Sequence, residues 1–212
     1  MNAAQALDEG AAALDIPLDA QARSRLLAYA DLILKWNKVY NLTALRDPAL
    51  VLSHHLLDSL AVLPALRVQW PGPAHLLDVG AGAGLPGVVI SIACEDVEVS
   101  CLDAVAKKAA FVQQVASELG LKHLHGVHAR VEKLSGSYEL ITSRAFASLA
   151  DFVSGSAHLL APGGLWMAMK GKKPDEEIQA LPATVEVFHV EQLQVPTLDA
   201  ERCIVWMRKR SV

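Results

Sequence analysis

LLDVGAGAGLPG, residues 76–87, is a short apolar run that ends in glycines and leads into a second apolar segment. This pattern is typical of a buried strand, a tight turn and a helix that opens with proline. Glycines in such a turn let the backbone bend sharply and let a ligand lie against bare peptide. Gly82, Gly84 and Gly87 also fit the spacing of the dinucleotide-binding loop. That match alone is weak, because glycine-rich turns are common in α/β proteins.

Strand-like and helix-like segments alternate after this loop. Apolar or alternating runs predict strands at residues 75–79, 97–103, 123–129, 138–145, 164–170, 185–195 and 202–209. Helical spacing predicts helices at residues 86–94, 107–119 and 148–160. Such alternation predicts a doubly wound parallel sheet. The last two strands leave no room for a helix between them, so we expect them to form an antiparallel pair at the sheet edge.

The first third of the chain has a helical pattern. One helix is predicted from about 20 to 38 with Asp19 as its N-cap, and a second from Pro48 to Leu63, closed by Pro64. Trp70–Pro73 is a strong helix breaker. We therefore predict an α/β fold with a helical region at 1–70 and a Rossmann-like core at 71–212. The two should form one compact unit.

Composition narrows the class of protein. Hydrophobic residues make up 52% of the 212 residues and charged residues 20%, which predicts a sizeable core. Uninterrupted apolar stretches stay short of a membrane span, and the start of the chain lacks the basic region of a signal peptide. Cys94, Cys101 and Cys203 lack metal-ligand spacing. We expect a cytoplasmic protein with reduced core thiols, no metal site and no membrane association.

The charges are unevenly distributed along the chain. The net charge of −4 argues against a protein that coats nucleic acid non-specifically. Residues 71–100 carry four acids and no lysine or arginine, whereas residues 101–173 carry nine bases against five acids. An anionic partner is therefore admissible, although ordinary solvated surface is the better explanation for any single lysine.

Asp103 is placed to bind a nucleoside. It ends the second predicted strand, 21 residues after Gly82. A carboxylate there can accept hydrogen bonds from both ribose hydroxyls of an adenosine. The alternative is a carboxylate that only caps the turn.

Asp78 separates two kinds of nucleoside ligand. A nicotinamide dinucleotide brings a pyrophosphate to the helix N-terminus, and a carboxylate before the first glycine would oppose that charge. S-adenosyl-L-methionine has no phosphate and carries cationic groups that the carboxylate stabilises. The pattern Asp78-x-Gly80-x-Gly82-x-Gly84 therefore favours a methyltransferase over an NAD-dependent oxidoreductase.

The fourth predicted strand limits the acceptor of the methyl group. The segment 140–147 has no Asn/Asp-Pro-Pro-aromatic turn for an exocyclic amine, and no cysteine for addition to a pyrimidine lies near it. An acceptor that is already nucleophilic remains, or an acid–base scheme that these residues do not reveal. Guanine N7 has a lone pair and no proton to lose, so it needs alignment more than a base. The residues permit this acceptor without selecting it.

Six segments carry a resemblance to a known family. They are WNKVYNLTALRDP (36–48), HHLLDSL (54–60), LLDVGAGAGLPGVVISI (76–92), SRAFASL (143–149), MKGKKPDEEI (169–178) and LQVPTLDAERCIV (193–205). From end to end the chain resembles the bacterial glucose-inhibited division protein B family, the small-subunit rRNA methyltransferases G. Ala83 and His54 stand where some relatives have proline and arginine.

The resemblance implies an activity and its residues. It implies methylation of guanine N7 in 16S rRNA, free or in the small ribosomal subunit, by a monomer that uses S-adenosyl-L-methionine. It implies donor contacts at Gly80, Leu85, Asp103, Val131, Glu132 and Arg144. It implies catalytic or RNA-facing roles for Asn41, His55, Arg130, Arg144, Lys170 and Arg202. The loop adds Asp78, Gly82 and Gly84 to the donor set, and the basic run adds Lys172 and Lys173 to the RNA-facing set.

Structural interpretations remain open for several of these residues. Arg144 could form an ion pair with Glu132 or Asp103. Asn41 could cap a turn, and His55 could be a capping or core histidine. An RNA-binding scaffold that has lost the donor remains the non-enzymatic alternative, although the intact glycine loop speaks against it.

Overall fold

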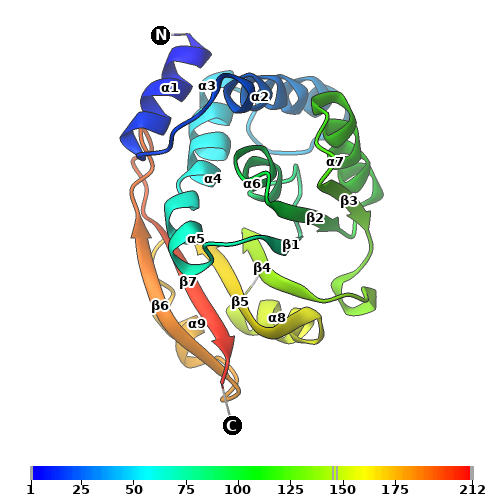
Figure 1. The fold of residues 1–212 in the computed structure, drawn as a ribbon, viewed down its shortest axis with the longest axis vertical. Helices are drawn as coiled ribbons and strands as arrows, with labels where there is room; N and C mark the ends of the chain where they lie inside the picture. Colours follow the sequence, from blue (N-terminus) through cyan, green and yellow to red (C-terminus); the bar gives the residue numbers. More distant parts are fainter. Residues whose placement is uncertain (1, 145, 147, 211–212) are drawn as a thin grey trace.

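Within residues 2–144, 146 and 148–210, which a computed structural model describes, seven strands form one sheet in the order β3-β2-β1-β4-β5-β7-β6 (Figure 1). The strands are β1 Ala74–Val79, β2 Val97–Asp103, β3 Leu124–His128, β4 Tyr138–Arg144, β5 Leu160–Lys170, β6 Val185–Leu193 and β7 Arg202–Lys209. Strands β1 to β5 pair in parallel, and β7 pairs antiparallel with both β5 and β6. The predicted parallel sheet and antiparallel edge pair are confirmed. Ala145, the predicted last residue of the fourth strand, lies outside the described residues.

Helices connect the strands and form the first third of the chain. They are α1 Ala3–Ala13, α2 Ala20–Tyr40, α3 Pro48–Val51, α4 Asp58–Leu60, α5 Leu63–Gln69, α6 Gly87–Ala93, α7 Ala106–Leu119, α8 Leu149–Ser156 and α9 Asp175–Gln179. Leu52–Leu57 forms a π-helix, η1, and Val131–Lys133 and Ala157–Leu159 form 3₁₀ turns, η2 and η3. The predicted cap at Asp19 is confirmed, since its side chain accepts the Ala22 N–H at 2.7 Å.

Side chains alternate between the two faces of the sheet. Leu76 of β1 and Leu140 of β4 lie in the core under α2, α4, α6 and α7. Their neighbours Leu77 and Ile141 lie in a second core under α8. Period-two alternation of this kind buries both faces of a parallel sheet. The first core also contains Leu7 of α1, so the helices before residue 70 share the core of the sheet.

The prediction for residues 48–63 was wrong in two respects. Pro64 does not close the helix; it lies in the first turn of α5, where the missing N–H of proline costs nothing. The π-helix η1 interrupts the segment at Leu52–Leu57, and sequence spacing does not predict it. Single-turn π segments are frequent at functional sites.

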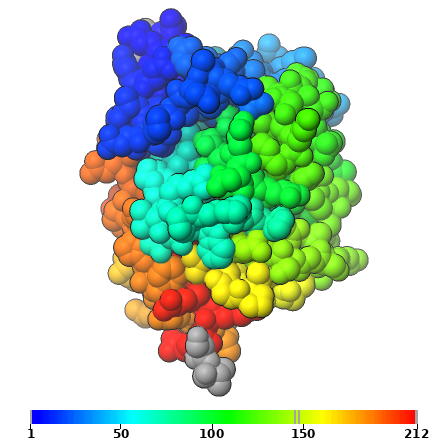
Figure 2. All heavy atoms as spheres, in the orientation of Figure 1, coloured from blue at the N-terminus to red at the C-terminus, as the bar shows by residue number. Residues whose placement is uncertain are grey.

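Pro48–Gln69 as a whole has the length and apolar composition of a membrane span, and 72% of its most apolar window is buried inside the protein. Figure 2 shows this segment, in cyan, between the blue N-terminal helices and the orange and red C-terminal strands. Packing in the core accounts for its apolar composition.

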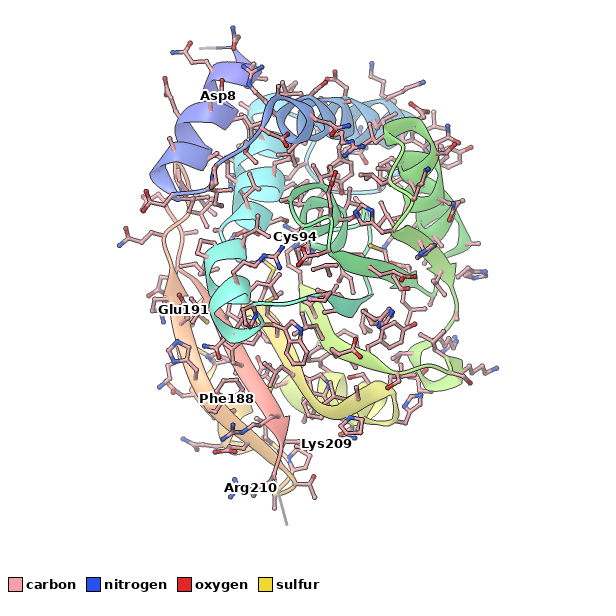
Figure 3. All side chains as sticks on the ribbon, in the orientation of Figure 1. Asp8, Cys94, Phe188, Glu191, Lys209 and Arg210 are labelled. Atoms are coloured by element: carbon pink, nitrogen blue, oxygen red, sulfur yellow. The ribbon has the colours of Figure 1, made fainter. Side chains whose placement is uncertain are left out.

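The edge strand β6 carries charged and aromatic side chains, among them Phe188 and Glu191 (Figure 3). Arg208 of β7 pairs with Glu186 at 2.8 Å, and its guanidinium lies 5.0 Å from the Phe188 ring centre. Charges on an edge strand oppose pairing with another chain.

Candidate active site

The loop after β1 exposes bare backbone on its outer side. Gly80 and Gly82 have φ of +70° and +62°, a left-handed region in which a side chain is strained. Among the described residues, a Cβ on Gly82 would meet only the Gly80 carbonyl at 4.0 Å, and one on Gly80 only the Phe146 ring at 3.9 Å. A ligand can therefore approach the backbone at these two positions.

The next residues of the loop face inward instead. A Cβ on Gly84 would collide with Val88, and one on Gly87 would lie 2.5 Å from the Cys101 Sγ. Leu85 is only 2% exposed. Gly84 and Gly87 thus allow the helix α6 to pack closely on the strands. Donor contacts were predicted at Gly84 and Leu85, but both residues lie beneath the surface of the loop.

Asp78 is fully buried under the loop. Its Oδ2 accepts the Gly87 N–H at 2.9 Å, whereas its Oδ1 has no partner among the described residues. Burial raises the pKa of Asp78 to about 7, although the Gly87 N–H and the Arg144 charge act in the opposite direction. A cation bound at the loop would favour the ionised form of this carboxyl.

Asp103 connects the end of β2 to the loop. Its Oδ2 accepts the Gly82 N–H at 3.0 Å and its Oδ1 accepts the Val105 N–H at 2.8 Å. The Lys108 ammonium lies 3.8 Å from the Oδ2. The carboxylate therefore caps the turn, and it also lines the pocket in front of the loop. Each oxygen has a second lone pair with which to accept a ligand hydroxyl.

We name this cavity the glycine-loop pocket. It has a volume of about 200 Å³ and is lined by Val79, Gly80, Leu102, Asp103, Ala104, Ala129, Arg130, Val131, Glu132 and Phe146. It brings together four of the predicted donor residues. Arg130, predicted to face RNA, also lines it. Phe146, which packs 5.7 Å from the Phe152 ring, was not predicted although it stands in the segment 143–149.

A second cavity, the arginine pocket, has a volume of about 440 Å³. It is lined by Leu45, His54, His55, Asp58, Arg144, Met169, Lys170, Gly171 and Arg202. Four residues predicted for catalysis or RNA contact therefore meet here. They come from the N-terminal helices, from the carboxyl ends of β4 and β5, and from the start of the antiparallel β7.

Asp58 is the centre of the arginine pocket, and the sequence analysis missed it. Its Oδ2 lies 3.1 Å from the Arg144 Nη1 and its Oδ1 lies 2.8 Å from the Arg202 Nε. Only 3% of the Asp58 side chain is exposed. The proposed pairing of Arg144 with Glu132 or Asp103 is wrong, because Asp58 is its partner. An acidic residue inside the apolar segment 54–60 was the signal in the sequence that could have identified Asp58.

His55 lies in η1 and is 7% exposed. Its Nε2 is 2.7 Å from the Thr43 hydroxyl and its Nδ1 is 3.4 Å from the Arg144 Nη2. Arg144 also donates to the His54 carbonyl at 3.0 Å. Burial, followed by the Arg144 charge, lowers the pKa of His55 to about 4. The ring is therefore neutral near pH 7.

The loop after α2 is held by Asn37, which the sequence analysis did not single out. Its side chain donates to the Leu45 carbonyl at 2.7 Å and accepts the Thr43 N–H at 3.0 Å. Asn41 is the left-handed C-cap of α2, is exposed, and accepts a bond from Arg46 at 3.0 Å. Asn41 therefore caps the helix and does not line the arginine pocket.

Lys170, at the end of β5, links the two pockets. Its ammonium lies 2.8 Å from the Glu177 carboxylate and 3.4 Å from the Phe146 carbonyl. Lys172 and Lys173 are exposed beyond it, and Lys173 pairs with Asp175 at 2.6 Å. Acids therefore neutralise part of the positive charge of this basic run.

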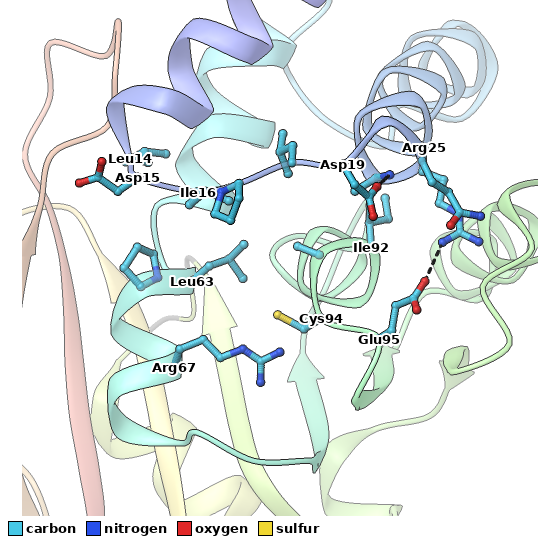
Figure 4. Close-up of a pocket in the computed structure, with 16 residues that line it drawn as sticks. Leu14, Asp15, Ile16, Asp19, Arg25, Leu63, Arg67, Ile92, Cys94 and Glu95 are labelled. Carbon is cyan, nitrogen blue, oxygen red and sulfur yellow. Dashed lines mark hydrogen bonds and ion pairs between the residues drawn. The ribbon is translucent and has the colours of Figure 1, made fainter.

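A third cavity, of about 630 Å³, lies elsewhere (Figure 4). Arg25, Arg67 and Cys94 are among its lining residues, at the edge where β2 begins. None of the predicted site residues lines it. Cys94, Cys101 and Cys203 are all buried and unpaired, as predicted for core thiols.

Comparison with known families gives the assignment. Residues 22–205 match the family described as rRNA small subunit methyltransferase G. The chain belongs to this family. It is therefore a methyltransferase, and its methyl donor is S-adenosyl-L-methionine.

Known members of the methyltransferase G family match the chain over nearly its full length. The ribosomal RNA small subunit methyltransferase G of Acidovorax sp. (strain JS42) is 59% identical, over 96% of this chain and 94% of the relative. That of Polaromonas sp. (strain JS666 / ATCC BAA-500) is 60% identical, over 98% of this chain and 94% of the relative.

Solved structures show the same fold at low identity. TrmN from Thermus thermophilus has a TM-score of 0.59 and 18% identity, covering 75% of this chain and 53% of that one. The 1,6-didemethyltoxoflavin-N1-methyltransferase of Burkholderia thailandensis, solved with S-adenosylhomocysteine, has a TM-score of 0.58 and 17% identity, covering 92% of each chain. The methyltransferase G chain thus has the predicted Rossmann-like fold of S-adenosylmethionine-dependent methyltransferases.

Proposed function

We propose that this chain transfers a methyl group from S-adenosyl-L-methionine to N7 of a guanine in 16S rRNA of the small ribosomal subunit. Family membership supports the reaction and the substrate. The observation that carries the proposal in this structure is the meeting of two different pockets at one edge of the sheet. The glycine-loop pocket suits the donor, and the arginine pocket suits a nucleotide.

The residues of the glycine-loop pocket fit the donor. The orphaned, buried Oδ1 of Asp78 suits a cationic ligand, and the open backbone at Gly80 and Gly82 suits a close approach. Asp103 would accept the ribose hydroxyls. Val131 and Glu132 would meet the adenine edge. When bound, the donor supplies a methyl group on a positively charged sulfur.

The arginine pocket suits an acceptor that needs no general base. His55 is neutral and engaged with Thr43 and Arg144, so it is not placed as a free base. Guanine N7 presents its own lone pair, and alignment with the methyl group is what the protein must supply. Arg144, Lys170 and Arg202 would bind the guanine edge or its phosphates. A catalytic role for Asn41 would need the loop after α2 to move.

Exposed cations around the two pockets would guide the RNA backbone. Arg130 lies at the rim of the glycine-loop pocket, and Lys172 and Lys173 lie beyond Lys170. His55 is buried, so its effect on RNA would be exerted through Arg144. We also propose that the protein is a monomer and that it is located in the cytoplasm. The burial of Pro48–Gln69 supports a protein that does not associate with a membrane.

The test is transfer of labelled methyl from the donor to 16S rRNA and to the purified small subunit, followed by mapping of the modified base. The proposal predicts one modified guanine that carries the label at N7. Label on another base or atom would contradict it. Tight binding of S-adenosylhomocysteine without transfer to either RNA would favour a silent scaffold, and binding of NAD in its place would favour an oxidoreductase.

A further inference from the structure

A buried carboxylate holds two guanidinium groups in the arginine pocket. Asp58 begins α4 directly after the π-helix, and each of its oxygens takes a different arginine. The side chains of Arg144 and Arg202 are 22% and 25% exposed, so both groups reach solvent while the carboxylate does not. The Asp58 carboxylate and the guanidinium groups of Arg144 and Arg202 together carry one net positive charge.

The arginines have few other fixed partners. Arg144 donates to the His54 carbonyl, and Arg202 donates to the Glu201 carbonyl at 2.8 Å. These carbonyls help to orient the guanidinium groups but carry no charge. Among the described residues, Asp58 is the ion-pair partner of both arginines.

The charge of the pocket matters for the proposed reaction. The lone pair of guanine N7 forms the new bond to the methyl carbon, and the electrons of the broken carbon–sulfur bond stay on sulfur. No proton leaves, so the guanine ring gains the positive charge that the sulfur loses. A pocket with two uncompensated guanidinium groups would oppose that charge, most strongly where water is excluded.

We infer that Asp58 is a positioning residue for methyl transfer: it fixes Arg144 and Arg202 at the mouth of the arginine pocket and offsets one of their charges as the guanine becomes cationic. The inference rests on the proposed function. The N-terminal helices would then contribute to the reaction, because Asp58 acts on the reacting guanine through two arginines of the core. His54 and His55 of the π-helix and Asp58, the first residue of α4, all line this one pocket.

The test is Asp58→Asn, which keeps the size of the side chain and removes its charge. The inference predicts that turnover at saturating RNA falls by about tenfold or more, while RNA affinity at low salt stays equal or becomes tighter, because the pocket gains a net positive charge. A role in structure alone would weaken RNA affinity and turnover together. That joint loss, or unchanged turnover, would overturn the inference.

Two measurements keep this test interpretable. Affinity for S-adenosylhomocysteine should match wild type within about twofold, since four of the predicted donor residues line the glycine-loop pocket; a larger loss would show general damage and overturn the assigned role. The matched control is Asp96→Asn, an exposed acid paired with Arg67; neither residue lines either pocket. It should leave turnover and RNA affinity unchanged, and a fall in turnover equal to that of Asp58→Asn would overturn the inference.

A double variant tests the connection between the two charges. Turnover of Asp58→Asn with Arg202→Gln should fall no further than that of the more damaged single variant, because the second change restores the net charge. Losses that multiply would show independent roles and overturn the inference. If Asp58→Asn does not fold, Arg202→Gln alone should weaken RNA affinity more than turnover, and the reverse would overturn the inference. If wild type itself fails to methylate guanine N7, the proposed function fails instead.

Discussion

The glycine-loop pocket and the arginine pocket are assembled in different ways. The first is built from consecutive strand ends of the core, and its Gly82–Asp103 bond spans 21 residues. The second needs four distant segments, and its Arg202–Asp58 bond spans 144 residues. The glycine-loop pocket is therefore a local property of the α/β core. The arginine pocket exists only after the N-terminal helices have packed on that core.

The largest expected effect concerns the exposed glycine backbone. Gly82→Val should weaken S-adenosylhomocysteine binding by at least about a hundredfold, because the side chain would project into the space in front of the loop. Calorimetry with the folded variant measures this. Gly120→Val is the matched control, since Gly120 has a φ of +65° and open surroundings at the end of α7. Its equal backbone strain should leave donor affinity intact, and equal loss in both variants would contradict the pocket.

Substitutions of Arg144 and of Lys172 should change different properties of the enzyme. Arg144→Ala should reduce turnover at saturating RNA by about a hundredfold, because the guanidinium aligns the reacting groups. Lys172→Ala should leave that turnover intact and lower the log–log salt slope of RNA binding by about 0.7–0.9. Methyl transfer and filter binding across a salt series measure both. An effect of Arg144→Ala on RNA affinity alone would remove Arg144 from the alignment of the reaction.

Asp103 should matter to the donor and not to RNA. Asp103→Ala should weaken donor binding by about tenfold to a hundredfold, the range for hydrogen bonds to a charged group. Asp103→Asn keeps an acceptor for the Gly82 N–H and should lose less. Calorimetry with S-adenosylhomocysteine measures both variants. Wild-type affinity in Asp103→Ala would show that the carboxylate is only a turn cap.

A further expected effect is a pH dependence of stability in the arginine pocket. The pKa of His55 is about 4 in the folded protein against an ordinary 6.5, so the unfolded chain binds the proton more tightly. The contribution of the neutral His55 ring to the free energy of unfolding is therefore complete above pH 6.5 and is lost as the pH falls toward 4. Relative to His55→Gln, wild type should lose about 2–3 kcal/mol of unfolding free energy over that range. Asp78 titrates in both proteins and cancels in the difference. Parallel stability curves would contradict a buried neutral His55.

The sequence-based predictions succeeded for features that depend on neighbouring residues and failed for features that depend on distant segments. The parallel sheet with its antiparallel edge pair and the cap at Asp19 depend on local patterns, and the sequence contains those patterns directly. Val131 and Glu132, which line the glycine-loop pocket, were expected from the family resemblance. Asp58 and Phe146 were missed because their neighbours are contributed by distant segments. The helix ending at Pro64 was mispredicted because proline fits a first turn as well as a stop. The roles of the individual site residues and the division of the chain near residue 70 stay predictions.

The central claim is that donor and RNA occupy separate pockets, and nuclear magnetic resonance of the isotope-labelled protein tests it directly. S-adenosylhomocysteine should shift the backbone amides of Gly80 and Gly82 and leave the Arg202 Nε–H in place. A guanine-containing fragment of 16S rRNA should shift the Arg202 Nε–H and leave both glycine amides unchanged. If both ligands shift the same set of signals, the two-pocket account is wrong.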